Sequence, residues 1–319
     1  MYKFNLYYIK TPLIHKSREF FVLLYLLIFP ISILFSFILF RPSLKISRLA
    51  GAIDFPNDRK IHLKPMARAG GFSFFIAFTL ILLISSVDLS FKIPMLLGSA
   101  TIFLVGFLDD STNLSPFMKL SGQFLALSVY QFSRELSGGD ISIFQSILIS
   151  VWLIFITNAT NIIDGLDGLA GGVCASQSLC LAVLSLILGN KDAFLCSLLL
   201  LGVILGFLPH NFPRAKIFMG DCGSLFLGFV LACISGRLFS DNPSILCAIS
   251  ILLIFRVPSY DTIFSFTRRI LKGRNPFYAD RGHFHHRLIA LGFSKECTTL
   301  ALVTLSLAFG LLGIITSII

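Results

Sequence analysis

Charged residues are scarce in this chain of 319 residues: Asp, Glu, Lys and Arg make up 13%, about half the share found in soluble domains. The seven cysteines include no CxxC pair, which argues against a disulfide scaffold and against a paired-cysteine metal or redox site. Hydrophobic residues make up 55% of the chain, and the mean hydropathy is +0.87. An ordinary soluble enzyme and a disordered chain are both excluded, and the composition is that of a polytopic membrane protein.

A cleavage site of the A-x-A type is also lacking after the first apolar run, so we expect an uncleaved first span rather than a signal peptide. A helix needs about 20 mostly apolar residues to cross the hydrocarbon core. We therefore predict an all-α, polytopic integral membrane helix bundle of about ten (10–11) transmembrane helices, forming one membrane-embedded domain over 1–319. The predicted spans are 20–40, 70–87, 93–108, 117–133, 141–157, 165–188, 193–209, 223–240, 243–260 and 297–318.

The net charge of +10 could indicate nucleic-acid binding, but no basic soluble domain is present to carry it. Lys and Arg instead gather in alternate loops: 17 lie in 41–69, 109–119, 158–164, 210–222 and 261–296, against 7 in the other set. By the positive-inside rule the first set is cytoplasmic and both termini face outward. Most acidic residues share the cytoplasmic loops, so we expect an active site on that face.

Two adjacent acids, Asp109 and Asp110, end the third predicted span in the motif GFLDD. A carboxylate at a helix C-terminus meets the negative end of the helix dipole. The pair is therefore costly unless a cation lies near it, either a hard divalent metal or an Arg or Lys side chain.

Polar groups recur every three residues in NATNIIDGLDGLAGG, at Asn158, Asn161, Asp164 and Asp167. A polar junction between two spans would explain them without a function. However, carboxylates and amides at the edge of a membrane are expensive unless they bind something. The motif favours a binding site.

A third motif, NFPRAKIFMGDCGS, leads into the eighth predicted span. Asp221 could simply cap that helix. A glycine-rich helix start with a Ser is also suited to a phosphate or a metal ion. Phe218 could stack on a base, or it could be buried in the bundle.

The last cytoplasmic loop contains DRGHFHHR, with His283, His285 and His286 close to Arg281. A zinc site would need a matching Cys or His pair elsewhere, and none is present. Arg is a bidentate phosphate donor, so these residues are better suited to binding an anion. Taken together, the loops predict a Mg²⁺ and diphosphate site at a membrane surface.

The chain resembles the polyprenyl-phosphate N-acetylhexosamine-1-phosphate transferases of the glycosyltransferase 4 type. The resemblance covers nearly the whole chain through five motifs in family order. They are RKIHLKPMARAGG, GFLDD, NATNIIDGLDGLAGG, FMGDCGS and PFYADRGHFHHRL. It implies transfer of a sugar 1-phosphate from a UDP-sugar to undecaprenyl (polyprenyl) phosphate with release of UMP, the initiating step of a cell-envelope polysaccharide.

The resemblance also implies roles for residues. Asp221 would ligate Mg²⁺, with Mn²⁺ as an alternative metal. Asp109 and Asp110 would act on the polyprenyl phosphate or assist the metal, with Asp109 as a candidate base, and His283 would be a further catalytic residue. The residues expected to hold the substrates are Lys119, Asn158, Asn161, Asp164, Asp167, Asn211, Phe218, Arg281, His285 and His286.

The D-R-x-H-x-H-H and R-K-x-H patterns resemble the GlcNAc-1-phosphate type, so GlcNAc is the expected sugar. Another UDP-N-acetyl sugar, either a deoxy-amino sugar or MurNAc-pentapeptide, is the alternative. The resemblance further implies a bacterial inner (plasma) membrane location and, at the level of the family, a homodimer; the outward termini expected from the loop charges would then be periplasmic or extracellular. Two rivals are weaker: a CDP-alcohol phosphatidyltransferase, whose motif is incomplete here, and a secondary transporter, which would need ionisable residues near mid-span.

Overall fold

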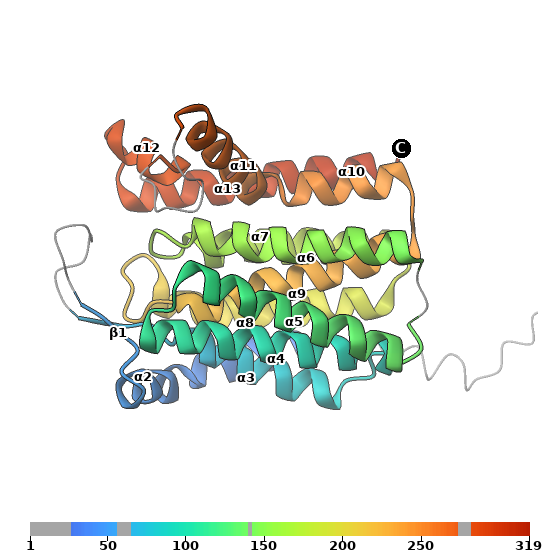
Figure 1. Ribbon diagram of the computed structural model, residues 1–319, viewed down its shortest axis with the longest axis horizontal. Coiled ribbons are helices and arrows are strands. Elements are labelled where there is room, and N and C mark those ends of the chain that lie inside the picture. Colours follow the sequence, from blue (N-terminus) through green and yellow to red (C-terminus); the bar gives the residue numbers. More distant parts are fainter. Residues whose placement is uncertain (1–26, 56–64, 140–141, 274–281) are drawn as a thin grey trace, which may run out of the picture.

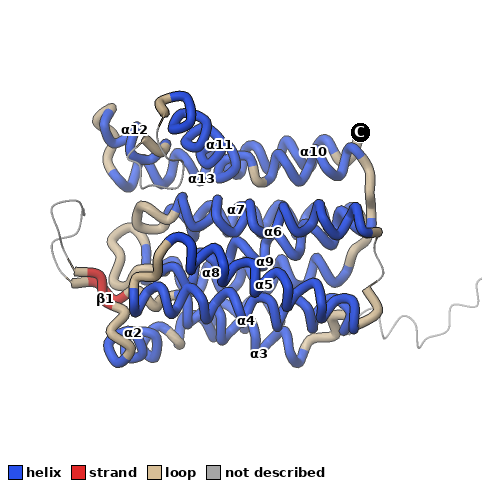
Figure 2. The backbone as a smooth tube through the Cα atoms, viewed as in Figure 1, coloured by secondary structure: helices blue, strands red, loops and turns tan. Residues whose placement is uncertain are grey.

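The computed structural model describes residues 27–55, 65–139, 142–273 and 282–319, which form a bundle of long helices (Figure 1). Helices make up most of these residues, and strand is confined to one short hairpin (Figure 2). The helices are Leu27–Ile38, α2 (Phe40–Leu49), α3 (Gly71–Ile84), α4 (Leu89–Thr112), α5 (Pro116–Leu136), α6 (Ile143–Ile163), α7 (Leu169–Ile187), α8 (Lys191–Asn211), α9 (Gly220–Asp241), α10 (Ile245–Ile254), α11 (Arg256–Leu271), α12 (Phe284–Ala290) and α13 (Lys295–Thr316). The prediction of an all-α membrane bundle is confirmed at this level.

Several helices begin where a short polar side chain satisfies the first free N–H groups. Ser115 caps α5 by accepting from the Met118 N–H, with a proline following at the first helical position. Ser142 and Gln145 form a reciprocal capping box at the start of α6. By contrast, α9 has no side-chain cap from its own N-cap residue, Met219.

Each predicted span overlaps either one helix or a bent pair of helices. Not all of these helices have the length and apolar composition needed to cross a membrane. Within the described residues six helices have both, and the number rises to eight if each of two bent pairs is counted as one span. α3 has only 14 residues, and α5 has the length but not the apolar composition. Lys119 and Gln123 dilute α5, as its sequence indicated.

The ninth predicted span, 243–260, is wrong as a single straight helix. The chain bends by 77° between α10 and α11, and α11 continues to Leu271 inside the region expected to be a loop. Pro258 explains the break, because a proline ring clashes with the carbonyl four residues earlier, here that of Ile254. In the first turn of a new helix the same proline is tolerated.

Helix α9 lies at the centre of the bundle and is the most buried of the six span-length helices. Small residues let its first turns approach two neighbours closely. A Cβ built on Gly71 of α3 would lie 2.4 Å from the Gly223 backbone, and one on Gly106 of α4 would lie 2.5 Å from the Cα of Cys222. Backbones at this distance admit only glycine on the facing side.

Strands β1 (Ile53–Asp54) and β2 (Met66–Ala67) form an antiparallel hairpin at the end of the bundle where α9 begins. The segment before α9 extends this pairing, since the Phe218 N–H donates to the Ala67 carbonyl and the Phe218 carbonyl accepts from the Gly70 N–H. The same end contains the C-termini of α4, α6 and α8 and the N-termini of α7 and α13, which sets the position of the site.

The close contact between α4 and α9 predicts that Gly106→Ala lowers the thermal unfolding temperature in detergent solution. The added methyl group must push two backbones apart, a cost of about 1–3 kcal/mol for an overpacked core. Gly236→Ala is the matched control on α9, because its Cβ would meet only side-chain atoms of Ile149 at 3.5 Å or more. Equal unfolding temperatures for the two variants would contradict this account of the packing.

Candidate active site

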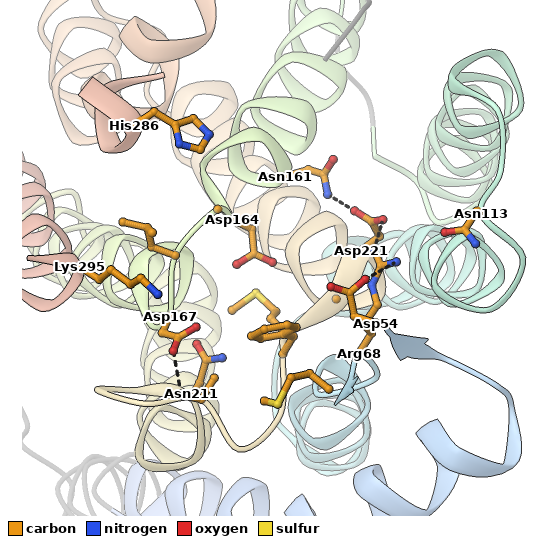
Figure 3. Close-up of a pocket in the computed structure, with 17 residues that line it drawn as sticks. Asp54, Arg68, Asn113, Asn161, Asp164, Asp167, Asn211, Asp221, His286 and Lys295 are labelled. Atoms are coloured by element: carbon orange, nitrogen blue, oxygen red, sulfur yellow. Dashed lines mark hydrogen bonds and ion pairs between the residues drawn. The ribbon is translucent and has the colours of Figure 1, made fainter. Parts of the chain in front are cut away.

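A cavity of about 580 Å³ opens at the end of the bundle where the predicted functional loops converge (Figure 3). Its walls come from the hairpin, the last turns of α6 and α8, the first turn of α9, α12 and the start of α13. Seven predicted site residues line it: Asn161, Asp164, Asp167, Asn211, Phe218, Asp221 and His286. These seven residues come from three regions that are widely separated in sequence, so the fold brings the three together in one place.

Asp110 supplies the cap that α9 lacks. Its two carboxylate oxygens accept from the backbone N–H groups of Asp221 and Cys222, both at 2.9 Å. The N-terminal end of a helix favours negative charge, so α9 stabilises an acid that the C-terminal end of α4 disfavours. This bond joins α4 to α9 and fixes Asp221 in the first turn of α9, beside the cavity.

Arg68 follows β2 and pairs with three carboxylates of the site. Its guanidinium lies 3.3 Å from Asp110 Oδ1, 3.2 Å from Asp221 Oδ2 and 3.8 Å from Asp54 Oδ1. The planar guanidinium offers several donors in fixed directions, which suits it to bridging separate acids.

Lys119, near the start of α5, brings a second positive charge to the cluster. Its Nζ lies 2.5 Å from Asp109 Oδ2 and 3.3 Å from Asp221 Oδ2. The other oxygen of Asp109 accepts from the Leu114 N–H at 2.7 Å, which fixes the turn after α4. The sequence therefore indicated correctly that the acidic pair needs a cation nearby, and two basic side chains meet part of that need.

The two asparagines of the motif NATNIIDGLDGLAGG, Asn158 and Asn161, have different surroundings. Asn161 donates to Asp221 Oδ1 at 2.5 Å and to Ser224 Oγ at 2.8 Å, so it orients the acid toward the cavity. Asn158, one turn earlier on α6, forms a reciprocal amide pair with Gln123 of α5 and does not line the cavity. In this structure Asn158 therefore makes a helix–helix contact, and its expected contact with the substrate stays a prediction.

Asp164 projects into the cavity between the Asp221 side and the His286 side (Figure 3). Within the part of the chain that the structure describes, its carboxylate makes no hydrogen bond or ion pair. Burial raises the pKa of this carboxyl, and the negative charges of Asp221 and Asp110 raise it further, to about 8. The cavity is thus short of positive charge at this point.

Asp167 and Asn211 both line the cavity, but their side chains form hydrogen bonds to backbone groups of neighbouring loops. Asp167 accepts from the Ala215 N–H at 3.0 Å. Asn211 accepts from the Gly168 N–H at 2.9 Å and donates to the Ile217 carbonyl at 3.0 Å. These bonds shape the loop between α8 and α9, which carries the Phe218 side chain to the cavity wall.

The three histidines occupy three different positions. His286 lines the cavity, whereas His285 packs behind Gly165, where a Cβ would lie only 2.4 Å from its Nε2. Burial, together with the neighbouring His286, lowers the pKa of His285 to about 4, so this ring is neutral at neutral pH. His283 is buried against Asp261 of α11. Arg281 lies outside the described residues.

Sequence reasoning missed four residues of this region: Asp54, Arg68, Lys295 and Asp261. Lys295 lines the cavity from the first turn of α13, beside Asp167 and opposite the acidic cluster (Figure 3). Arg68 could have been predicted as a site residue, because it lies within the motif RKIHLKPMARAGG and directly precedes the Ala-Gly-Gly at the start of α3. Lys295 lies in no motif, and only the fold brings it to the cavity.

The donor chemistry of the cavity suits a hard divalent cation. Among the described residues, no three Asp, Glu, His or Cys side chains are grouped so as to hold a metal ion by themselves. Mg²⁺, however, is usually bound through one or two carboxylates and completes its coordination with water and substrate phosphates. Asp221 and Asp164 offer oxygen donors at the cavity wall, and no Lys or Arg among the described residues forms an ion pair with Asp164. The residues fit such an ion.

Comparison with known proteins agrees with this architecture. A family model described as glycosyl transferase family 4 matches residues 92–238. The chain is 34% identical to a probable undecaprenyl-phosphate N-acetylglucosaminyl 1-phosphate transferase of Bacillus subtilis, over 83% of this chain and 77% of the relative. It is 35% identical to the undecaprenyl-phosphate alpha-N-acetylglucosaminyl 1-phosphate transferase of Thermotoga maritima, over 82% and 81%.

The corresponding enzyme of Escherichia coli K12 is 27% identical over 83% of this chain and 76% of its own length. These similarities extend over most of both chains. They confirm the resemblance carried by the five motifs and leave no support for a transporter. The chain belongs to glycosyl transferase family 4.

Proposed function

We propose that the protein transfers N-acetylglucosamine 1-phosphate from UDP-GlcNAc to a polyprenyl phosphate and releases UMP. The named relatives are polyprenyl-phosphate N-acetylglucosaminyl 1-phosphate transferases, which supports the reaction class and the sugar. The structural observation that carries the proposal is the acidic cluster of Asp110, Asp221 and Asp164 beside the cavity, with Arg68 and Lys119 at its back. Phosphoryl transfer depends mainly on positioning and on neutralising charge, and these residues can do both.

Asp221 and Asp164 are the residues that would hold Mg²⁺, or Mn²⁺ in its place. When bound, the ion would neutralise phosphate charge and polarise the phosphate that reacts. Asp110 is committed to the backbone of α9 and to Arg68, so its role is to hold Asp221 in place. Asp109 is paired with Lys119 and remains the candidate base of the reaction.

The donor would enter with its uracil against Phe218 and its diphosphate toward the acidic cluster. Phe218 is presented to the cavity by a loop that Asn211 and Asp167 hold through its backbone. His286 and Lys295 lie on the opposite wall, where they can contact phosphate or sugar hydroxyls (Figure 3). By the family resemblance, Arg281 and His283 are further residues expected to act on the substrates.

The chemistry exchanges one phosphoanhydride for another. An oxygen of the lipid phosphate attacks the sugar-bearing phosphorus, the bond from that phosphorus to the UMP oxygen breaks, and UMP leaves. The exchange is close to neutral in free energy and needs no ATP. A direct attack by the lipid requires no nucleophile from the protein, and an aspartyl-phosphate intermediate is the alternative.

The site would face the cytoplasm of a bacterial inner membrane, and both termini would face outward. This orientation is supported by the excess of Lys and Arg in the loops that meet at the cavity. It assumes ten crossings: the six span-length helices, α3, α5, and two bent pairs each counted as one, Leu27–Ile38 with α2 and α10 with α11. A homodimer remains part of the proposal on the strength of the family alone.

Purified protein is expected to release UMP only when UDP-GlcNAc, undecaprenyl phosphate and Mg²⁺ are all present. EDTA should abolish the release and excess Mg²⁺ should restore it, because Asp164 forms no ion pair with a Lys or Arg of the described residues and Mg²⁺ would supply the missing positive charge. UDP-GalNAc and UDP-MurNAc-pentapeptide, assayed in parallel, test the sugar. UMP release without lipid, or from every donor except UDP-GlcNAc, would contradict the proposal.

Asp164→Asn is expected to raise the Mg²⁺ concentration needed for half-maximal activity by about tenfold or more, the loss typical when a group that supports a metal ion is altered. The amide keeps the size of the side chain and removes its charge. Asp192→Asn, in the first turn of α8 and remote from the cavity, is the matched control. An unchanged Mg²⁺ requirement in Asp164→Asn would remove Asp164 from the metal site.

A further inference from the structure

Helices α11 and α12 are joined by a dense set of contacts on one face of α11. Tyr260 and Phe264 both stack on Phe284, with ring centroids 5.5 and 6.3 Å apart. One turn further along, Arg268 donates to the Gly282 carbonyl at 2.7 Å. The face is regular because residues three to four apart lie on one side of a helix. Asp261, next to Tyr260 in sequence, also contacts the start of α12.

Asp261 is 2% exposed and uses both oxygens to hold the start of α12. Oδ1 accepts from the Phe284 N–H at 2.9 Å, which gives α12 the cap that His283 does not provide. Oδ2 lies 2.9 Å from Nδ1 of His283. Ser265, one turn along α11, places its Oγ 3.1 Å from the same nitrogen.

The bond to Asp261 determines which nitrogen of His283 carries hydrogen. An ionised carboxylate can only accept, so Nδ1 must be the donor. In a neutral ring Nε2 is then left with a free lone pair. His283 is therefore held in the tautomer that can accept a proton or a hydrogen bond through Nε2.

The same contact determines where the other histidines lie. The rings of His283 and His285 are nearly parallel, with centroids 5.9 Å apart, and His285 lies 4.2 Å from His286. His286 reaches the cavity wall, and Gly165 leaves the room that His285 needs. Asp261 thus fixes one end of a row of three rings whose other end lines the cavity.

We propose that Asp261 is a positioning residue of the active site, which sets the tautomer of His283 and the placement of the histidine row. The inference rests on the proposed transferase function only for its activity readout. Asp261 itself is behind the rings, does not line the cavity and acts through His283.

Asp261→Asn tests the proposal, because the amide keeps the size of the side chain and can still accept from the Phe284 N–H. Its NH₂ group would then face Nδ1, which reverses the tautomer of His283. We expect kcat to fall by about 100-fold or more, with little change in KM for UDP-GlcNAc. A fall of this size is the rate acceleration that a correctly protonated general acid or base usually provides. Ser265→Ala is the matched control on the same nitrogen, and its kcat should stay within about threefold of wild type.

A double variant separates positioning from a merely structural effect. If Asp261 acts through His283, adding Asp261→Asn to His283→Ala should cost little beyond His283→Ala alone. Additive losses would overturn the proposal, as would a kcat for Asp261→Asn within about threefold of wild type.

Histidine ¹⁵N spectra of the purified protein test the tautomer without any assay, since the chain has only six histidines. The His283 signal, assigned by its loss in His283→Ala, should show hydrogen on Nδ1 in the wild type and on Nε2 in Asp261→Asn. Hydrogen on Nε2 in the wild type would overturn the inference. Absence of UMP release by wild-type protein would count against the proposed function and leave this spectroscopic result standing.

Discussion

The arrangement of the site depends on one contact between two helices that run in opposite directions. Helix α9 begins without a side-chain cap of its own, and Asp110 at the end of α4 fills that place through two backbone N–H groups. The negative end of α4 and the positive end of α9 therefore meet through a single carboxylate. The close backbone approach at Gly106 and Cys222 permits this meeting, and Asp221 is placed beside the cavity as a result.

Charge balance then determines what the cavity can bind. Arg68 and Lys119 pair with Asp109, Asp110 and Asp221 on the protein side, while Asp164 on the cavity side forms no ion pair within the part of the chain that the structure describes. Buried acids are tolerated only when they are paired or when they bind a cation. A divalent ion that arrives with a diphosphate suits this arrangement, because it satisfies the acids and the phosphates together.

The sequence predicted the helical membrane bundle, the convergence of the loops and the need of the acidic pair for a cation. It did so because apolar length, loop charge and helix polarity are local properties. It did not predict that Asn158 pairs with Gln123, that Lys295 reaches the cavity or that Asp261 holds His283. Those contacts join residues that are remote in sequence, and only packing determines them. The bend between α10 and α11 could have been predicted from Pro258, but the continuous apolar run favoured a single straight span.

The most direct test of the account is Mn²⁺ binding to purified protein, followed by electron paramagnetic resonance in the presence of UDP-GlcNAc. Free Mn²⁺ gives a sharp spectrum that bound Mn²⁺ does not, so the bound fraction can be measured without catalysis. The account predicts a saturable Mn²⁺ site in the wild type that is lost in Asp221→Asn. The variant should still elute as a single symmetric peak in size-exclusion chromatography, which shows that it is folded. Equal Mn²⁺ binding by the folded variant and the wild type would contradict the claim that the start of α9 holds the metal.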